Sequence, residues 1–194
     1  LSGSRGGIAM VAMQTKKRIL NRLAGMFKPG GVENGPFNQD PREVSGVGAK
    51  IIWLAPDIKQ KVCGEFGVNP NDVEIMLMRV SGGAPEVHRH KRADSLLQVL
   101  GAEHGFNDPT GSTLMGAPES NEQRTILSLK THEPGELIHV KPGVIHGFMA
   151  RERDGLVAIG IQDPPDPGRR VVRHRTLHPW GRRQDRGAVP GRRL

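Results

Sequence analysis

Turn-forming residues interrupt this chain so often that long helices cannot account for its middle part. Glycine and proline contribute 26 and 15 of the 194 residues, about a fifth of the chain where ~12% is usual. After Val47, short apolar segments alternate with turn sequences such as Asn69-Pro70-Asn71, Glu133-Pro134-Gly135 and Arg153-Asp154-Gly155. Short segments bounded by such turns are typical of strands in an all-β sandwich or barrel.

The pattern predicts eight short strands: Lys50–Leu54, Val73–Val80, Glu86–His90, Ser95–Gly101, Arg124–Lys130, Glu136–Val140, Val144–Ala150 and Leu156–Ile161. One amphipathic helix is expected before them, over Lys16–Lys28, because apolar residues repeat there at helical spacing and basic residues occupy the other faces. The chain therefore divides into three parts. An N-terminal segment with one helix covers 1–44, a barrel covers 45–167, and an Arg-rich tail covers 168–194.

The net charge of +8 comes from the two ends of the chain. Residues 1–28 carry six Lys/Arg and no acid, and residues 168–194 carry nine arginines and one acid, whereas the segment between them is acidic. A nucleic-acid-binding domain concentrates its basic residues on a folded face, so we do not expect nucleic acid as a partner. The apolar runs are far shorter than the ~20 residues of a bilayer-spanning helix, so no membrane partner is expected either.

Cysteine and tyrosine usage restrict the chemistry further. Cys63 is the single cysteine, and tyrosine is absent. One cysteine cannot form an internal disulfide, so a reducing compartment and a cytoplasmic location are expected. Any mechanism with a tyrosine as acid, base or nucleophile is excluded.

Two closely spaced histidines give the strongest chemical signal. In His88-Arg89-His90 both imidazoles point to one face of a strand, because side chains two residues apart share a face. Asp94 would share that face if the strand continued without a break, and His146 follows a tight turn at Lys141-Pro142-Gly143. Three imidazoles and a carboxylate inside a barrel suit one divalent metal ion per chain, whether Fe, Mn, Ni, Co or Zn, with positions left for water, substrate or dioxygen.

The spacing of these residues resembles the two motifs of the cupin family. The first family motif is glycine, five residues, His-x-His, three or four residues, glutamate, six residues and glycine. This chain reads Gly82, five residues, His88-Arg89-His90, three residues, Asp94, six residues and Gly101. The second family motif is glycine, five residues, Pro-x-Gly, two residues, histidine, three residues and asparagine. This chain reads Gly135, five residues, Lys141-Pro142-Gly143, two residues, His146, three residues and Ala150, so Lys141 replaces the proline and Ala150 the asparagine.

The resemblance implies a double-stranded β-helix, which is a jelly-roll barrel, and commonly a homodimer. It also implies a metal ion in the barrel mouth, held by His88, His90, Asp94 and His146. The Asp94 side chain is one methylene shorter than the glutamate of the motif. Two roles for it therefore stay open: a direct ligand, or a group that acts through water or as a base.

Three further residues are candidates for contact with a substrate. His104 is expected in the loop after the strand that starts at Ser95, where it could line the barrel mouth and serve with Asp94 as a catalytic base. Gln98 follows Asp94 by an even number of residues, so both side chains share one face of a strand. We therefore expect Gln98 to point inward and to hydrogen-bond a substrate. Arg79 lies among apolar residues on a strand and is either solvated on the outside or an anchor for an anionic substrate.

The favoured interpretation is a metal-dependent enzyme that acts on a small polar or aromatic molecule. With iron, the open coordination positions would permit dioxygenase chemistry. Alternatively, the same ion could polarise a carbonyl for an isomerase, cyclase or lyase reaction. The remaining alternative is a non-catalytic cupin that binds a metal or a small ligand.

Overall fold

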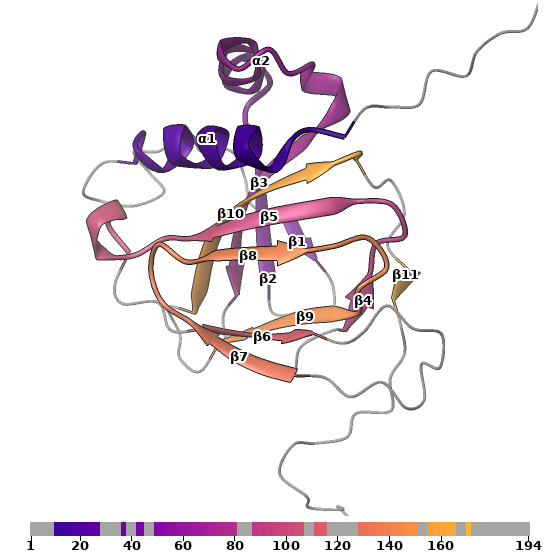
Figure 1. Cartoon of the computed structure of the whole chain (residues 1–194). Coiled ribbons are helices and arrows are strands. Elements are labelled where there is room, and N and C mark those ends of the chain that lie inside the picture. Colours follow the sequence, from indigo (N-terminus) through magenta and orange to yellow (C-terminus); the bar gives the residue numbers. More distant parts are fainter. Residues whose placement is uncertain are drawn as a thin grey trace, which may run out of the picture.

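Two antiparallel sheets face each other in the computed structural model (Figure 1), which describes residues 10–27, 36–37, 42–44, 49–80, 87–106, 111–115, 128–150, 155–165 and 170–171. In the first sheet the order is β1 (Arg42–Val44), β2 (Ala49–Trp53), β3 (Glu74–Val80), β10 (Leu156–Asp163), β5 (Asp94–Val99) and β8 (Leu137–Val140). In the second it is β11 (Arg170–Val171), β4 (His88–Arg89), β9 (His146–Ala150), β6 (Gly111–Met115) and β7 (Ser128–His132).

The chain passes back and forth between the sheets as it runs along the barrel. From β3 it crosses to β4, returns to β5, crosses again to β6 and β7, returns to β8, crosses to β9, returns to β10 and crosses a last time to β11. This connectivity is that of a double-stranded β-helix, so the predicted fold class is confirmed. No helix among the described residues is long and apolar enough to cross a membrane.

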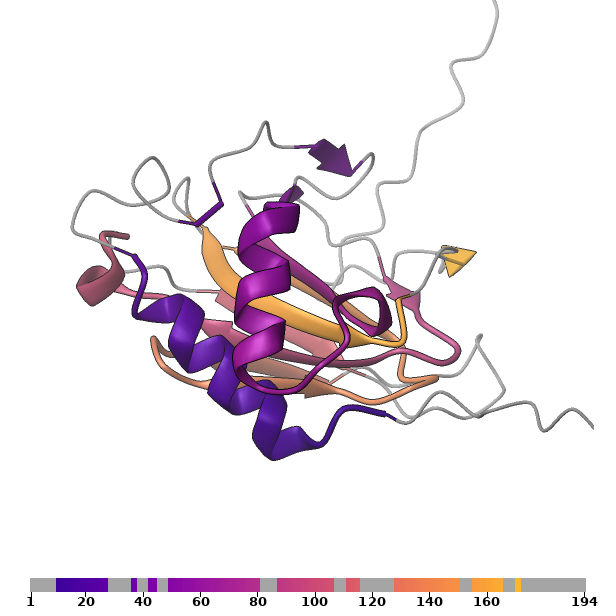
Figure 2. The same ribbon diagram turned by 90° about the horizontal axis from the view of Figure 1, so that it is seen from above.

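Two helices cover the outer face of the first sheet. They are α1 (Met13–Ala24) and α2 (Pro56–Glu65), which lie next to each other over that sheet (Figure 2). The α1 side chains Ile19, Leu20 and Leu23 are fully buried there. The predicted helix is therefore present, but it starts three residues earlier than expected and ends before Gly25. Helix α2 was not predicted, although Pro56 and Asp57 in its first turn are typical of a helix start.

Alternation along the strands separates an outer from an inner apolar cluster. Leu77 of β3 and Leu96 of β5 pack with the helices in the outer cluster. Met78 and Leu97, their chain neighbours, pack with Phe148 of the second sheet in the inner cluster. Neighbouring residues of these strands thus point to opposite faces, as the pleat requires. This alternation decides which polar side chains can reach the barrel interior.

All eight predicted strands have counterparts, and three further strands, β1, β6 and β11, were not predicted. Several predicted positions lie outside the described residues: Lys28 of the helix, Glu86 and residues 124–127 of two strands, residues 168–169 and 172–194 of the tail, and Gly82 of the first motif. Two short 3-10 helices, η2 (Pro70–Asp72) and η3 (Ala102–His104), occupy connections that were expected to be turns or loops.

Candidate metal centre

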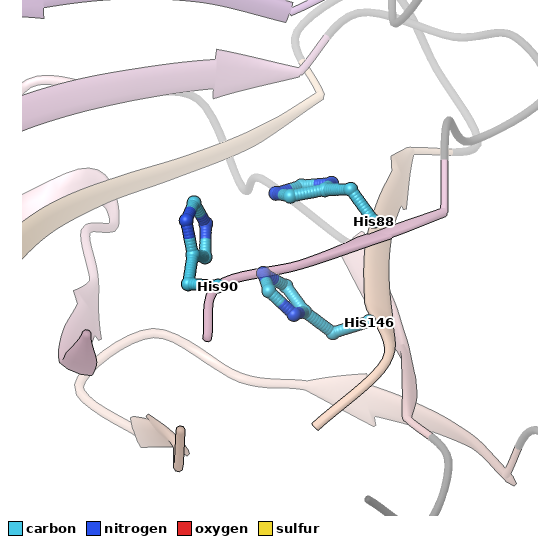
Figure 3. A group of neighbouring side chains, drawn as sticks. All are labelled: His88, His90 and His146. Carbon is cyan, nitrogen blue, oxygen red and sulfur yellow. The ribbon is translucent and has the colours of Figure 1, made fainter. Parts of the chain in front are cut away.

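Three histidines from the second sheet converge on one point. His88 on β4 pairs with His146 on β9, and His90 follows directly after β4. One ring nitrogen from each lies within 4.8 Å of those of the other two. The ring centroids are 4.3 Å apart for His88 and His146, and 5.0 and 5.3 Å apart for His90 and each of them. Figure 3 shows the three rings turned toward one another.

This group of three histidines faces the barrel interior. His146 shares its face of β9 with Phe148 and Ala150, both of which pack in the inner apolar cluster. The rings of His146 and Phe148 have centroids 5.8 Å apart. Relative exposures of 6, 9 and 3% show that His88, His90 and His146 are all buried. The group is thus shielded from bulk water at one end of the barrel.

Backbone hydrogen bonds orient two of these histidines. The Nδ1 atom of His146 lies 3.0 Å from the carbonyl oxygen of Val144, so Nδ1 is the donor and Nε2 is the nitrogen available to a metal ion. Metal-binding histidines commonly donate their second ring nitrogen in this way. The amide of Gly143, a residue with φ of +79°, donates to the carbonyl of His90 over 2.7 Å. The turn before His146 therefore also holds His90 in place.

The three histidines fit a divalent transition-metal ion. Nitrogen ligands lie about 2.0–2.1 Å from such an ion, so two of them on one ion are roughly 3.0–3.5 Å apart. Ligand atoms within 4.8 Å of one another reach that spacing by small side-chain rotations. Neutral imidazoles bind Zn, Cu, Fe and Ni in proteins. His88, His90 and His146 are the residues that would hold the ion.

Asp94 does not join the three histidines, which corrects the expectation that it is a fourth metal ligand. It shares its face of β5 with Leu96, which packs beneath the helices. Its Oδ2 accepts a hydrogen bond from Lys16 Nζ over 2.6 Å, and its Oδ1 lies 2.7 Å from His139 Nε2. The bend between His90 and β5 interrupts the strand, so the even spacing no longer keeps both side chains on one face.

The carboxylate of Asp94 belongs instead to a buried ionic cluster beneath α1. Lys16 is fully buried and forms ion pairs with both Asp94 and Asp163. The backbone amide of Val11 donates to Asp163 as well. Burial raises the pKa of the Asp94 carboxyl, but the hydrogen bonds from Lys16 and His139 outweigh it and lower the net pKa. Asp94 is thus held ionised on the outer face of the sheet.

The other three predicted site residues also lie away from the histidines. Gln98 shares the outer face of β5 with Leu96, so its predicted inward orientation is wrong. Arg79 is exposed on the outer face of β3, which corresponds to the solvated alternative. His104 lies in η3, beyond the far end of β5, and its Nδ1 accepts a hydrogen bond from the Gly101 amide over 3.2 Å. A strand of six residues spans about 17 Å, which separates His104 from the site.

A row of polar side chains on the inner face of the first sheet was not predicted. Ser95 of β5 pairs with Gln162 of β10, which pairs with Glu74 of β3. All three alternate with residues of the outer cluster and so point inward. Ser95 and Gln162 are buried and hydrogen-bonded to each other over 3.3 Å. The motif itself offered a signal, because four residues instead of three after His90 would select Ser95.

This polar row lies at the same end of the barrel as the histidines. Ser95 is the second residue of β5 and lies only five residues after His90. The strands β5, β10 and β3 are aligned so that Gln162 and Glu74 are at the same level as Ser95. Facing sheets pack about 10 Å apart. A small molecule held between the two sheets would therefore contact both the histidines and the polar row.

Comparisons with known proteins bear on the fold. No protein-family model matches the sequence, and no curated protein matches it. Among solved structures, the vicilin from Solanum melongena has a TM-score of 0.50 and 11% identity, over 73% of this chain but only 35% of the vicilin. KdgF from Halomonas sp. (16% identity, 66% and 89% of the two chains, TM-score 0.44) and an RmlC-like cupin from Shewanella frigidimarina (16%, 66% and 86%, 0.44) were also found.

The chain has the cupin fold. The alternation of strands between two facing antiparallel sheets defines it, and the likeness to the vicilin agrees with it. Within that fold, a buried set of three histidines occupies the inner wall of one sheet. Fold and site together therefore define a chain of cupin fold with three histidines suited to binding a metal.

Proposed function

We propose that this chain is a cupin enzyme that uses one divalent metal ion, bound by His88, His90 and His146, to act on a small molecule. The observation that carries the proposal is the convergence of three buried imidazoles inside the barrel. Histidine is the commonest metal ligand among the side chains. Three imidazoles lie in one apolar wall, and one nitrogen of each is near those of the other two. This is the arrangement that a metal ion requires.

The bound ion would supply Lewis-acid activation of substrate oxygens or, as iron, access to dioxygen chemistry. The ligand set is made of neutral imidazoles, so it leaves the full positive charge of the ion to the substrate. Ser95 and Gln162 are proposed to hydrogen-bond the part of the substrate that faces the first sheet. Glu74, at the end of the same row, is proposed as the proton acceptor. The inner apolar cluster lines the barrel next to them.

Oxygenase activity is our first candidate for the reaction. Isomerase, cyclase or lyase activity is the alternative, because the same ion and the carboxylate of Glu74 could move a proton next to a polarised carbonyl. Oxygen consumption by the iron-loaded protein with candidate substrates separates the two. We also propose that the protein acts on its small-molecule substrate as a homodimer, which sedimentation analysis tests.

The deciding experiment is the metal content of protein purified without added metal and without a nickel resin. We expect about one Fe, Mn, Ni, Co or Zn ion per chain in the wild type, and loss of that metal in the His88→Ala/His146→Ala double variant. His104→Ala is the matched control, because this histidine lies outside the group of three. Absence of metal from the wild type, with none taken up on reconstitution, would sink the proposal.

Variants of the polar row test the role of the first sheet. Ser95→Ala and Gln162→Leu should keep the metal, because neither residue belongs to the group of three histidines. They should weaken small-molecule binding or turnover. Loss of metal from these variants would contradict the assignment of the row to the substrate.

A further inference from the structure

The buried lysine of α1 is tied to the strand that follows the two closely spaced histidines. Lys16 is 0% exposed, although a lysine side chain is almost never fully buried unless it is paired. Its Nζ donates to Oδ2 of Asp94 over 2.6 Å and to the backbone carbonyl of the same residue over 2.7 Å. It also forms an ion pair with Asp163, the β10 partner of Asp94 in the sheet. One cation thus fixes both the side chain and the backbone of Asp94.

Anchoring of α1 does not require this cluster. The helix already buries Ile19, Leu20, Leu23 and Ala24 against the sheet. Buried ion pairs are often no more stabilising than apolar residues of similar volume, because both charges lose their hydration. The lysine instead fixes the helix at one position on the sheet, since it binds one main-chain oxygen there.

That place is the start of β5, directly after the metal-binding segment. Only Lys91, Arg92 and Ala93 separate Asp94 from His90, and Ala93 is buried. At the other end of this short bend, the carbonyl of His90 accepts a hydrogen bond from Gly143 over 2.7 Å. The bend is therefore held at both ends, once by the turn before His146 and once by Lys16.

We propose that Lys16 is a positioning residue for the metal centre. By fixing Asp94 beneath α1, it sets the bend that places His90, and with it His88, in a geometry that binds a metal ion. The inference rests on the proposed metal site, and it makes α1 part of that site although no α1 side chain belongs to it. By thermodynamic reciprocity, a metal ion bound to the histidines must in turn hold α1 more firmly on the sheet.

The test compares two variants of the same helix. Lys16→Met keeps the length of the side chain and removes its charge. Arg22→Met is the matched control, because Arg22 also lies on α1 and pairs with Glu65 over 3.1 Å, but both side chains are exposed. The Co²⁺ and Zn²⁺ affinities of each are measured by competition with a chelating dye, at a temperature where circular dichroism shows the variant to be folded.

We expect Lys16→Met to bind Co²⁺ and Zn²⁺ at least about tenfold more weakly than the wild type, the range seen when partners that orient metal ligands are removed. Arg22→Met should bind as the wild type does. Unchanged affinity in folded Lys16→Met, with metal binding intact in the wild type, overturns this inference alone. No binding by the wild type overturns the proposed metal site and this inference together.

A second measurement uses the wild type and needs no folded variant. Hydrogen exchange of the α1 amides is followed with and without Zn²⁺, and α2 serves as the internal reference. A larger slowing of exchange in α1 than in α2 on addition of the ion supports the coupling. Equal exchange in α1 with and without the ion, at saturating Zn²⁺, contradicts it.

Discussion

Gly101 offers a sharp test of the packing at the end of the barrel opposite the histidines. It follows β5 with φ of −135° and ψ of −161°, an extended conformation that any residue adopts. Its lack of a side chain is required for a different reason. A Cβ at this position would lie 2.5 Å from Cβ and 2.8 Å from Cγ of Pro134. Pro134 cannot easily withdraw, because the amide of Gly135 next to it donates to the carbonyl of Val99 over 2.9 Å.

Gly101→Ala should therefore destabilise the fold by about 1–3 kcal/mol, the usual cost of forcing extra atoms into a packed region. Non-bonded carbon atoms prefer a separation of about 3.5–4.0 Å, so the turn must shift by roughly 1 Å. Gly64→Ala is the control. This glycine lies in α2, where an added Cβ would meet nothing within 4 Å, and the same change there should stabilise by up to about 1 kcal/mol.

Urea denaturation followed by circular dichroism measures the free energy of unfolding of both variants. The same glycine-to-alanine change should lower the free energy of unfolding at Gly101 and raise it at Gly64. This expectation is refuted if Gly101→Ala unfolds at the same urea concentration as the wild type. It is equally refuted if Gly64→Ala loses as much stability as Gly101→Ala, because a general intolerance of alanine would then explain both.

Two further predictions follow from the titration of single groups. Burial raises the pKa of the Asp94 carboxyl, but hydrogen bonds from Lys16 and His139 lower it overall, and Asp163 is the other carboxylate on the same lysine. Asp94→Asn should therefore lower the free energy of unfolding by its full amount at pH 6, and this loss should shrink as the pH falls below about 3.9, the ordinary pKa of the carboxyl. A loss that stays constant in urea denaturation from pH 6 to pH 3 would contradict this. Burial raises the pKa of the Cys63 thiol, so a thiol reagent should modify it only after unfolding, and rapid modification of the native protein would be the contrary result.

The barrel could be predicted from the sequence because its signals are local. An apolar segment with a turn at each end identifies a strand without knowledge of its partners, as in Leu156–Ile161 between Gly155 and the prolines that follow Asp163. The pair His88 and His90 needs only the two-residue period of a strand. Helix α2 was missed because it buries only Val62 and Cys63, which is too narrow an apolar stripe to be recognised in ten residues.

The positions of Asp94 and Gln98 could not be obtained in the same way. Counting by twos from His90 assigns both to the interior, but the count is valid only along one unbroken strand. The chain bends over residues 91–93, and β5 begins in a new sheet with its own alternation. Asp94 and Gln98 therefore face the helices, and Ser95 takes the inward position. A bend of this kind depends on tertiary contacts with Gly143 and Lys16, which are far away in sequence.

The position of Lys16 in the sequence nevertheless carried part of the information about Asp94. With Ile19, Leu20 and Leu23 it follows the i, i+3, i+4, i+7 spacing that marks one face of a helix, so the lysine lies on the apolar face and not on a solvated one. A lysine ammonium taken into the protein interior needs a carboxylate partner, because burial without one is very costly. The expectation that the basic residues of this helix occupy its other faces is therefore wrong for Lys16, which is fully buried. The acid that pairs with a buried lysine is not free to bind a metal ion. The identity of that acid as Asp94 required the fold, since only strand pairing brings it next to Asp163 beneath the helix.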